Sequence, residues 1–316
     1  MLSDAQNTIW PVDPEKVSVV IPVLNAESFL PALLPALARQ GLPLHRYLIL
    51  DSQSDDCTAQ LFRDFGATVV EVERATFNHG GTRQHAVDLR PNAEIIIMLT
   101  QDAIPQNEHS LLLLTSAFSD VQVGMAYGRQ LPRNGSDPIE RHARQFNYPA
   151  TSEARSFQDR HRLGVKTVFC SNSFAAYRAN ALRESGGFPL DAFFAEDQLV
   201  AAKMLKEGWK LAYCGEAEVV HSHKYSILEE FRRYFDIGVF HGRNDWLLET
   251  YGRAEGEGMR FARSELAYLA RRQPWHLPSA AARLVAKYAG YRLGKKERFL
   301  RNSWKTNLSM QPSYWK

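Results

Sequence analysis

A five-residue apolar run, Ile95–Leu99, is followed at once by Thr100, Gln101 and Asp102. A short run of this kind, bounded by polar turn residues, predicts a strand that is buried on both faces of a parallel sheet. We expect Pro105 to prevent the strand from continuing. Ligands of open α/β sheets bind beyond the carboxyl ends of the strands. Asp102 is therefore placed to hold a divalent cation, although an Asp here can also cap the next helix.

The residues before this run alternate between strand and helix patterns. Strand patterns occupy 17–23, 47–50 and 67–72, and helical patterns occupy 26–40 and 59–65. Such alternation predicts an α/β protein with a doubly wound, Rossmann-like, mostly parallel sheet flanked by helices. The second half is predicted to add strands at 124–130, 167–177 and 213–220 and helices at 198–207 and 231–242.

Several protein classes are excluded by what the chain lacks. No GxGxxG follows the first strand and no GxxxxGK[ST] occurs, so the usual phosphate loops are missing. A net charge of +3 does not indicate a nucleic-acid partner. Three cysteines argue against a disulfide framework and favour the cytoplasm. The start of the chain has no signal-peptide pattern, and no apolar stretch approaches a membrane span.

Several stretches, taken in their order, resemble the inverting GT-A-fold nucleotide-sugar glycosyltransferases of family 2. They are VSVVIPVLNAE at 17–27, LDSQSDD at 50–56, Asp102, and AEDQLVAAKMLKEGWKLAY at 195–213. Three more resemble the bacterial rhamnosyltransferase branch: FNHGGTRQHA at 77–86, MLTQDAIP at 98–105 and FRRYFDIGVFHGRN at 231–244. The resemblance implies a GT-A transferase domain over 1–245 and a helical basic C-terminal extension over 246–316.

The function that this resemblance implies is transfer of L-rhamnose from dTDP-L-rhamnose to a glycan or lipid-linked saccharide acceptor in bacterial surface polysaccharide synthesis. Transfer from another nucleotide sugar, such as a UDP-hexose, stays open. So does a non-catalytic nucleotide-sugar-binding protein, because Thr100 stands where the family often has an acid. A nucleotidyltransferase would normally show a Gly-rich basic loop after the first strand, and 23–27 has none.

The resemblance assigns the nucleotide to the ends of the first two strands. Asp51 resembles the carboxylate that accepts the pyrimidine N3–H and the ribose, and a carboxylate suits an imide donor. It could instead cap the following helix. Ser52 stands where the family often has a second acid. Pro22 and Asn25, predicted to form the turn out of the first strand, are also assigned to substrate binding.

A glycine-containing turn is predicted to open a helix at 78–83. Paired glycines let the backbone approach a ligand, and a helix N-terminus favours anions. The resemblance assigns Asn78, His79, Gly80 and Arg83 to the substrate, with Arg83 reaching the diphosphate or the sugar. Gln101 is assigned to the substrate as well. The alternative is an ordinary turn with a solvated arginine.

The resemblance places Asp102 at the last position of the D-x-D metal signature. His221 follows the last core strand and resembles a further metal or diphosphate ligand. His223 lies two residues on, which predicts the same strand face, and is assigned to the substrate. The expected cofactor is a divalent cation, Mg²⁺ or Mn²⁺, and imidazole suits Mn²⁺ better.

Asp197 resembles the general base that takes the acceptor hydroxyl proton, with Glu196 beside it. A carboxylate at a helix N-terminus is expected to ionise readily, although both acids could merely cap the helix. Ser171 and Asn172 resemble residues on the acceptor side. Arg243 is assigned to phosphate.

Two segments are strongly basic. Residues 132–165 contain six arginines, which suit solvated surface or an acceptor that carries diphosphate. In 246–316, basic residues alternate with aromatic ones. This pattern predicts either amphipathic helices on an anionic bilayer, at the inner face of the plasma membrane, or a basic tail that forms an oligomer.

Overall fold

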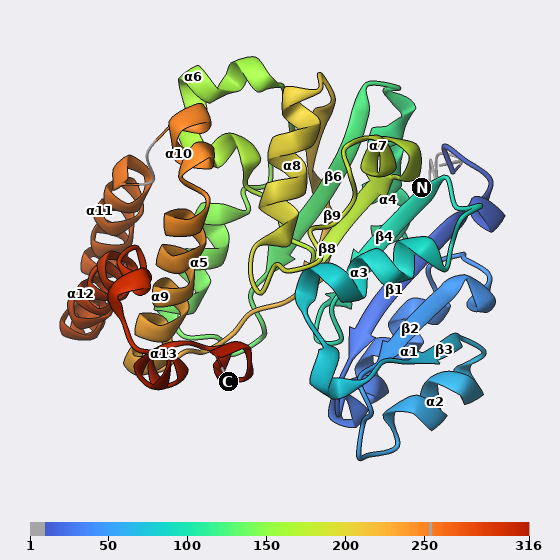
Figure 1. The fold of residues 1–316 in the computed structure, drawn as a ribbon, viewed down its shortest axis with the longest axis horizontal. Coiled ribbons are helices and arrows are strands. Elements are labelled where there is room, and N and C mark those ends of the chain that lie inside the picture. Colours follow the sequence, from blue (N-terminus) through green and yellow to red (C-terminus); the bar gives the residue numbers. More distant parts are fainter. Residues whose placement is uncertain (1–9, 253–254, 316) are drawn as a thin grey trace, which may run out of the picture.

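The computed structural model describes residues 10–252 and 255–315 of the chain. Within them a nine-stranded sheet has the order β3-β2-β1-β4-β8-β6-β9-β5, with β7 paired to β9 (Figure 1). The strands are β1 (Val17–Val23), β2 (Tyr47–Asp51), β3 (Thr68–Glu71), β4 (Ile95–Leu99), β5 (Ile104–Pro105), β6 (Val123–Leu131), β7 (Glu153–Arg155), β8 (Phe174–Arg178) and β9 (Lys210–Val220).

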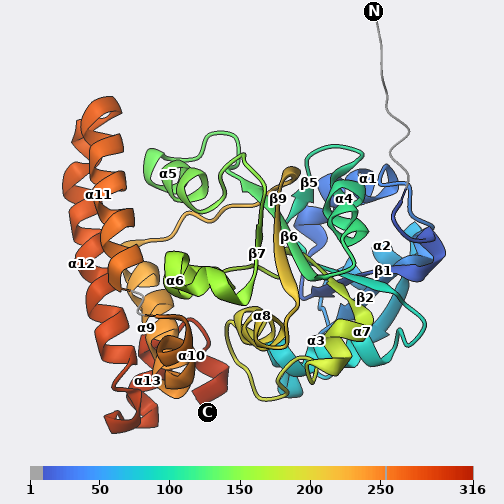
Figure 2. The ribbon, with the colours of Figure 1, turned by 90° about the horizontal axis from the view of Figure 1, so that it is seen from above.

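Helices cover the sheet and extend beyond one end of it (Figures 1 and 2). They are α1 (Leu30–Ala38), α2 (Thr58–Phe65), α3 (His79–Asp88), α4 (Ser110–Thr115), α5 (Pro138–Asn147), α6 (Arg160–Leu163), α7 (Ala179–Glu184), α8 (Glu196–Lys206), α9 (Ile227–Arg243), α10 (Asp245–Tyr251), α11 (Glu255–Arg272), α12 (Leu277–Gly294) and α13 (Asn302–Leu308). The predicted α/β class is confirmed.

Most of the long strands run in one direction. β1, β2, β3 and β4 pair in parallel, β8 lies antiparallel between β4 and β6, and β9 is parallel to β6. The carboxyl ends of β1, β2, β4, β6 and β9 therefore meet at one edge. Because β8 is reversed, the residues that precede it lie at this same edge. The topology thus gathers the loops after five strands and before a sixth, the usual place for a ligand in such sheets.

The run that opens the sequence is the centre of the sheet. Ile95, Ile97 and Leu99 point into the hydrophobic core on one face, and Ile96 and Met98 point into the core on the other. All five are fully buried, and burying such a side chain stabilises the fold by about 1.5–3 kcal/mol. β4 is thus fixed from both sides, and the turn that carries Asp102 starts from a rigid strand.

The predicted strand 17–23 coincides with β1, but the roles predicted for Pro22 and Pro105 and the start predicted for the strand at 167–177 were wrong. Pro22 lies inside β1 rather than in the turn, beyond the last β1–β4 pair at Val20, where β1 has a paired neighbour on one side only. Pro105 does not end β4; it forms the short β5 on β9. The predicted strand at 167–177 begins only at Phe174, because the Phe174 N–H closes a turn on the Ser171 carbonyl at 3.1 Å.

The C-terminal helices dock on α9 by direct backbone contact. A Cβ added at Gly238 of α9 would collide with the Tyr291 carbonyl, and one at Gly294 of α12 would collide with the Phe235 carbonyl. Gly290 stands in the same relation to the Phe231 carbonyl. The two helices therefore cross where neither has a side chain. Among the described helices, none is both long and apolar enough to cross a membrane.

Candidate functional site

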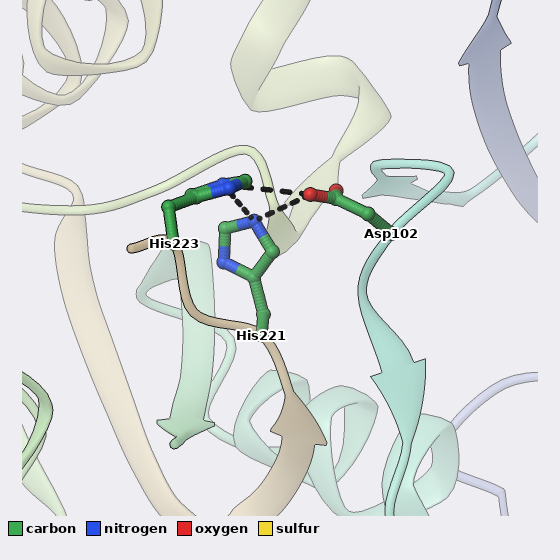
Figure 3. Close-up of side chains that lie close together, drawn as sticks. All are labelled: Asp102, His221 and His223. Carbon is green, nitrogen blue, oxygen red and sulfur yellow. Dashed lines mark hydrogen bonds and ion pairs between the residues drawn. The ribbon is translucent and has the colours of Figure 1, made fainter. Parts of the chain in front are cut away.

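The side chains of Asp102, His221 and His223 converge at the carboxyl edge of the sheet (Figure 3). Each imidazole Nε2 lies 3.4 Å from Asp102 Oδ2, and the two Nε2 atoms lie 3.0 Å apart. Three candidate ligand atoms within 4.8 Å of one another can surround a single cation. The structure therefore brings together the two predicted metal ligands and adds His223 to them.

Two strand ends position this cluster. Asp102 follows β4, and His221 follows β9 directly, with its N–H donating to the Leu131 carbonyl at 3.0 Å. Because β9 ends at Val220, the two histidines do not share a strand face as predicted; the loop itself turns His223 back toward His221. The helix-cap alternative for Asp102 is wrong, since the next helix, α4, begins only at Ser110.

The protonation states fit a cation. Burial lowers the pKa of His221, and burial with the nearby His221 lowers the pKa of His223 to about 4. Burial alone would raise the pKa of Asp102, but the neighbouring His221 and His223 hold it well below its ordinary value. Neutral imidazoles beside an ionised carboxylate are the forms that ligate a metal. Arg133, 3.9 Å from Asp102 through Nη2, adds positive charge beside the cluster.

Gln130, near the end of β6, supports the cluster and was missed by the sequence analysis. Its Oε1 lies 2.9 Å from His221 Nδ1 and accepts from Arg144 at 2.5 Å, while its Nε2 donates to Ser171 Oγ at 3.0 Å. The only signal in the sequence was a glutamine, beside Arg129, near the end of a largely apolar strand. Of the six arginines in 132–165, Arg133 and Arg144 thus reach the cluster.

A second polar cluster surrounds the start of α8. Glu196 and Arg83, both buried, form an ion pair of 3.0 Å between Oε1 and Nη1. The Asn172 side chain donates to Glu196 at 2.8 Å, and its backbone N–H donates to Asp197 at 3.0 Å. The Tyr177 hydroxyl donates to Asn172 Oδ1 at 2.6 Å. Asn172 and Ser171, adjacent in sequence, therefore connect this cluster to Gln130 and the histidines.

Asp197 is not the readily ionised carboxylate that the sequence predicted. Burial and then the neighbouring Glu196 carboxylate raise the pKa of Asp197 to about 7, which the N–H donors of Asn172 and Gln198 do not cancel. A base works best when its pKa lies near the working pH. Ala195 precedes the pair with a φ of 54°, a strained conformation for a residue with a Cβ that tends to occur at functional sites.

Arg83 carries a buried donor that the described residues leave without a partner. Its Nη1 bonds to Glu196 and to the His79 carbonyl, the latter at 3.0 Å, but its buried Nε has no hydrogen-bond partner within 10–252 and 255–315. His79 lies between Arg83 and the C-terminal segment, where its Nε2 is 3.3 Å from Gln311 Nε2. Gln311 is a second residue near the site that the sequence analysis did not identify.

The glycines of the 78–83 turn serve the chain itself. Asn78 caps α3, with Oδ1 accepting from the Gly81 N–H at 2.6 Å. A Cβ added at Gly80 would collide with the Pro189 carbonyl, and the Gly80 N–H points to the Ala192 carbonyl at 3.3 Å. The structure thus gives a different reason for Gly80 from the one predicted: it packs against the loop before α8. Its contact with a substrate stays a prediction.

Asp51, predicted to bind the nucleotide, is buried at the end of β2. Its oxygens accept from the Ser54 hydroxyl at 2.5 Å and the Ser54 N–H at 3.1 Å. It does not cap a helix, because α2 begins only at Thr58. Asn25, at the end of β1, adopts a positive φ of 50°, which asparagine tolerates better than most residues.

The neighbouring predicted residues shape these loops. The Gln101 amide holds Leu24, accepting from its N–H at 2.8 Å and donating to its carbonyl at 3.2 Å. Ser52 is buried, with its N–H on the Val23 carbonyl at 2.9 Å. Pro22 is half-buried beside them. A substrate contact of Gln101, Ser52 or Pro22 stays a prediction.

Arg243, predicted to bind phosphate, is held by the C-terminal residues. Its Nε lies 2.8 Å from Glu297 Oε1, and its Nη1 donates to the Tyr314 hydroxyl at 2.7 Å. The Tyr314 ring in turn stacks on Phe193, at 4.5 Å between ring centroids, in the loop before Asp197. The contacts of Arg243 therefore link α9, the extension and the loop that leads to the candidate base.

Solved structures show the fold. A mannosyltransferase from Pyrobaculum calidifontis, in complex with GDP-Man and Mn²⁺, is 21% identical, with a TM-score of 0.56 over 97% of this chain and 88% of that one. TarS of S. aureus, residues 1–349 in complex with UDP, is 16% identical, with a TM-score of 0.52 over 90% of this chain and 91% of that one. The predicted GT-A architecture is confirmed.

Two proteins found by sequence comparison are more similar to this chain than these solved structures are. The chain is 43% identical to the O-antigen chain rhamnosyltransferase RfbN of Salmonella typhimurium strain LT2, over 95% of this chain and 96% of the relative. It is also 43% identical to the O-antigen chain rhamnosyltransferase WbaN of Salmonella anatum, over 89% of each. Residues 18–186 match the profile of the family described as Glycosyl transferase family 2. This match covers more than half of the chain and agrees with the relatives and the fold, so the chain belongs to glycosyl transferase family 2.

Proposed function

We propose that the protein transfers L-rhamnose from dTDP-L-rhamnose to a saccharide acceptor in O-antigen chain synthesis. The observation that carries the proposal is 43% identity, over nearly the full length of both chains, to a protein named as an O-antigen chain rhamnosyltransferase. The two polar clusters at the carboxyl edge of the sheet supply the groups such a reaction needs. An intact Glu196–Arg83–Asn172 network argues against a protein that has lost catalysis.

The chemistry follows from these clusters. Asp197 takes the proton of the acceptor hydroxyl while the acceptor oxygen forms a bond to the anomeric carbon. The bond from that carbon to the nucleoside diphosphate breaks on the opposite face, so the configuration inverts. Arg133 and Arg144 offset charge on the leaving diphosphate. A divalent cation, held by Asp102, His221 and His223, would act as a Lewis acid on the same oxygens. Two imidazoles in this set favour Mn²⁺ over Mg²⁺.

The donor is tested by turnover across dTDP-rhamnose, dTDP-glucose, UDP-glucose and UDP-galactose. We expect dTDP-rhamnose to be preferred. Discrimination between thymine and uracil should be modest, because contact with one methyl group contributes about 1 kcal/mol. Discrimination among sugars should be larger, since a buried polar group left without its hydroxyl partner costs about 1–3 kcal/mol.

Slow hydrolysis of each donor, measured without acceptor, provides the control for an acceptor that has been chosen wrongly. Preference for a UDP-hexose in both assays would contradict rhamnose as the donor sugar and leave the family membership untouched. A thermal-shift series with the same nucleotides reports binding independently of turnover, since a ligand of the folded state raises the melting temperature.

We also propose that the extension over 246–316 contacts an anionic bilayer, the first of the two roles that its sequence predicts. Trp275, Tyr288 and Phe299 are 70%, 63% and 73% exposed. Residues 266–296 contain no Asp or Glu, and the same part of the chain carries exposed basic residues, namely Arg271, Arg272, Arg292 and Lys296. Figures 1 and 2 show α11 and α12 as the outer layer at the end of the molecule opposite α2. Aromatic rings among cations suit a lipid headgroup layer.

Sedimentation with vesicles tests this contact. The full chain should bind vesicles rich in phosphatidylglycerol and be released by salt, because each basic side chain near the surface contributes about 1 kcal/mol. The double variant Trp275→Ser and Phe299→Ser should bind several-fold less. The matched control is Val121→Ser, since Val121 is 76% exposed in another part of the chain. Equal binding to neutral phosphatidylcholine, or a dimer that only the double variant disrupts, would contradict the proposal.

A further inference from the structure

Gln130 occupies an unusual position between the two polar clusters. It is 2% exposed, and both ends of its amide are engaged. The oxygen meets His221 Nδ1 at 2.9 Å and the Arg144 guanidinium at 2.5 Å, and the nitrogen donates to Ser171 Oγ at 3.0 Å. The contact with His221 uses Nδ1, whereas the other ring nitrogen, Nε2, is the one that faces Asp102.

The orientation of this amide follows from Arg144. A guanidinium only donates hydrogen bonds, so the Gln130 atom facing it has to be the oxygen. The same oxygen faces His221 Nδ1, so that nitrogen has to carry a proton. In a neutral imidazole the other nitrogen, Nε2, then carries the lone pair. His221 Nε2 is the atom that lies 3.4 Å from Asp102 and 3.0 Å from His223 Nε2.

We propose that Gln130 is a positioning residue that fixes His221 in its Nδ1–H form, so that the Nε2 lone pair faces the cation site. Residues that orient a ligating histidine in this way commonly change metal affinity by about 10- to 100-fold when removed. The inference rests on the proposed metal site, and the Gln130 contacts are its own evidence.

The other end of the amide extends the role of Gln130 to the base. Ser171 is followed by Asn172, whose N–H donates to Asp197 at 3.0 Å and whose side chain donates to Glu196 at 2.8 Å. A single side chain thus holds a candidate metal ligand on one side and the segment that fixes the candidate base on the other. Losing it disturbs both halves of the reaction site.

Mn²⁺ binding in the presence of dTDP, followed by the electron paramagnetic resonance of free Mn²⁺, tests the inference without turnover. Gln130→Met keeps the shape and removes all three hydrogen bonds of the amide, to His221, Arg144 and Ser171, and we expect it to weaken Mn²⁺ binding by about 10- to 100-fold. Gln130→Glu keeps an acceptor for the Nδ1 proton and should restore binding to within a few-fold of the parent. The matched control is Gln40→Met, because Gln40 is also 2% exposed and hydrogen-bonded, to the Ala36 and Asn107 carbonyls.

The measurement distinguishes a failure of the role of Gln130 from a failure of the metal site. Parent-like Mn²⁺ affinity in Gln130→Met, or equal weakening in Gln40→Met, overturns the role of Gln130. A parent that binds no Mn²⁺ overturns the metal site instead. If Gln130→Met does not fold, ¹⁵N NMR of the parent decides, since the His221 signals should report a protonated Nδ1 and a bare Nε2. The opposite tautomer would overturn the inference.

Discussion

Replacing Asp197 by Asn is expected to lower the rate of sugar transfer by about 10²- to 10⁴-fold, the usual contribution of a general base. The amide keeps the size of the side chain and can still accept from the Asn172 N–H, so the fold and donor binding should persist. Turnover and donor affinity are measured on the same preparation. Asp191→Asn, at an exposed aspartate in the preceding loop, is the control and should retain parent activity. A variant at Asp197 that works at near the parent rate would remove it from the reaction.

The pH profile gives a second test of the same residue. The base is active when deprotonated, and the pKa of Asp197 is raised to about 7, so the parent rate should rise as the pH increases through 7. Because this pKa is higher in the folded chain than in the unfolded one, the folded state loses stability as the pH rises from about 4 to 7. Asp197→Asn should remove that part of the pH dependence of stability. A profile that is flat through pH 7 would contradict the assignment.

Loss of Asp102 is expected to abolish the divalent-cation dependence of nucleotide binding. In Asp102→Ala the two histidines remain, but the one carboxylate of the cluster is gone, and Thr100 cannot replace it. Calorimetry with dTDP, with and without Mn²⁺ or Mg²⁺, measures the effect. Asp88→Ala, at an exposed aspartate of α3, is the control. If the parent binds dTDP equally well with and without either metal, the cluster is not a cation site.

The sheet was predictable because its central strands have a distinctive sequence pattern. A run such as Ile95–Leu99 is apolar at every position, and only a strand covered on both faces needs that. The direction of the strands then places Asp51, Asp102 and His221 at one edge without further information. Predictions failed where local chemistry decides a boundary, as at Phe174, where a turn on Ser171 delays the strand.

The contacts that hold the site residues in place were not predictable to the same degree. Gln130 has its role only because β6 and β9 lie side by side, which brings it to His221, 91 positions later. The raised pKa of Asp197 depends on a burial that no spacing reveals. Gly80 resembled a glycine for a ligand, yet the group that needs the space is the Pro189 carbonyl, more than 100 positions away. Each case depends on a tertiary contact between distant segments.

The glycine crossing of α9 and α12 limits how the C-terminal helices can be exchanged between related enzymes. Gly238 and Gly294 bring two backbones together, so any larger residue at either position has to push the helices apart. A tail transplanted from a relative without this spacing would sit farther out. Its residues at the positions of Gln311 and Tyr314 would then lie too far from His79 and Phe193 to keep these contacts. We therefore expect the part of the chain up to α9 and the C-terminal helices to be inherited together. Chimaeras should keep transferase activity only when α9 and α12 come from the same parent.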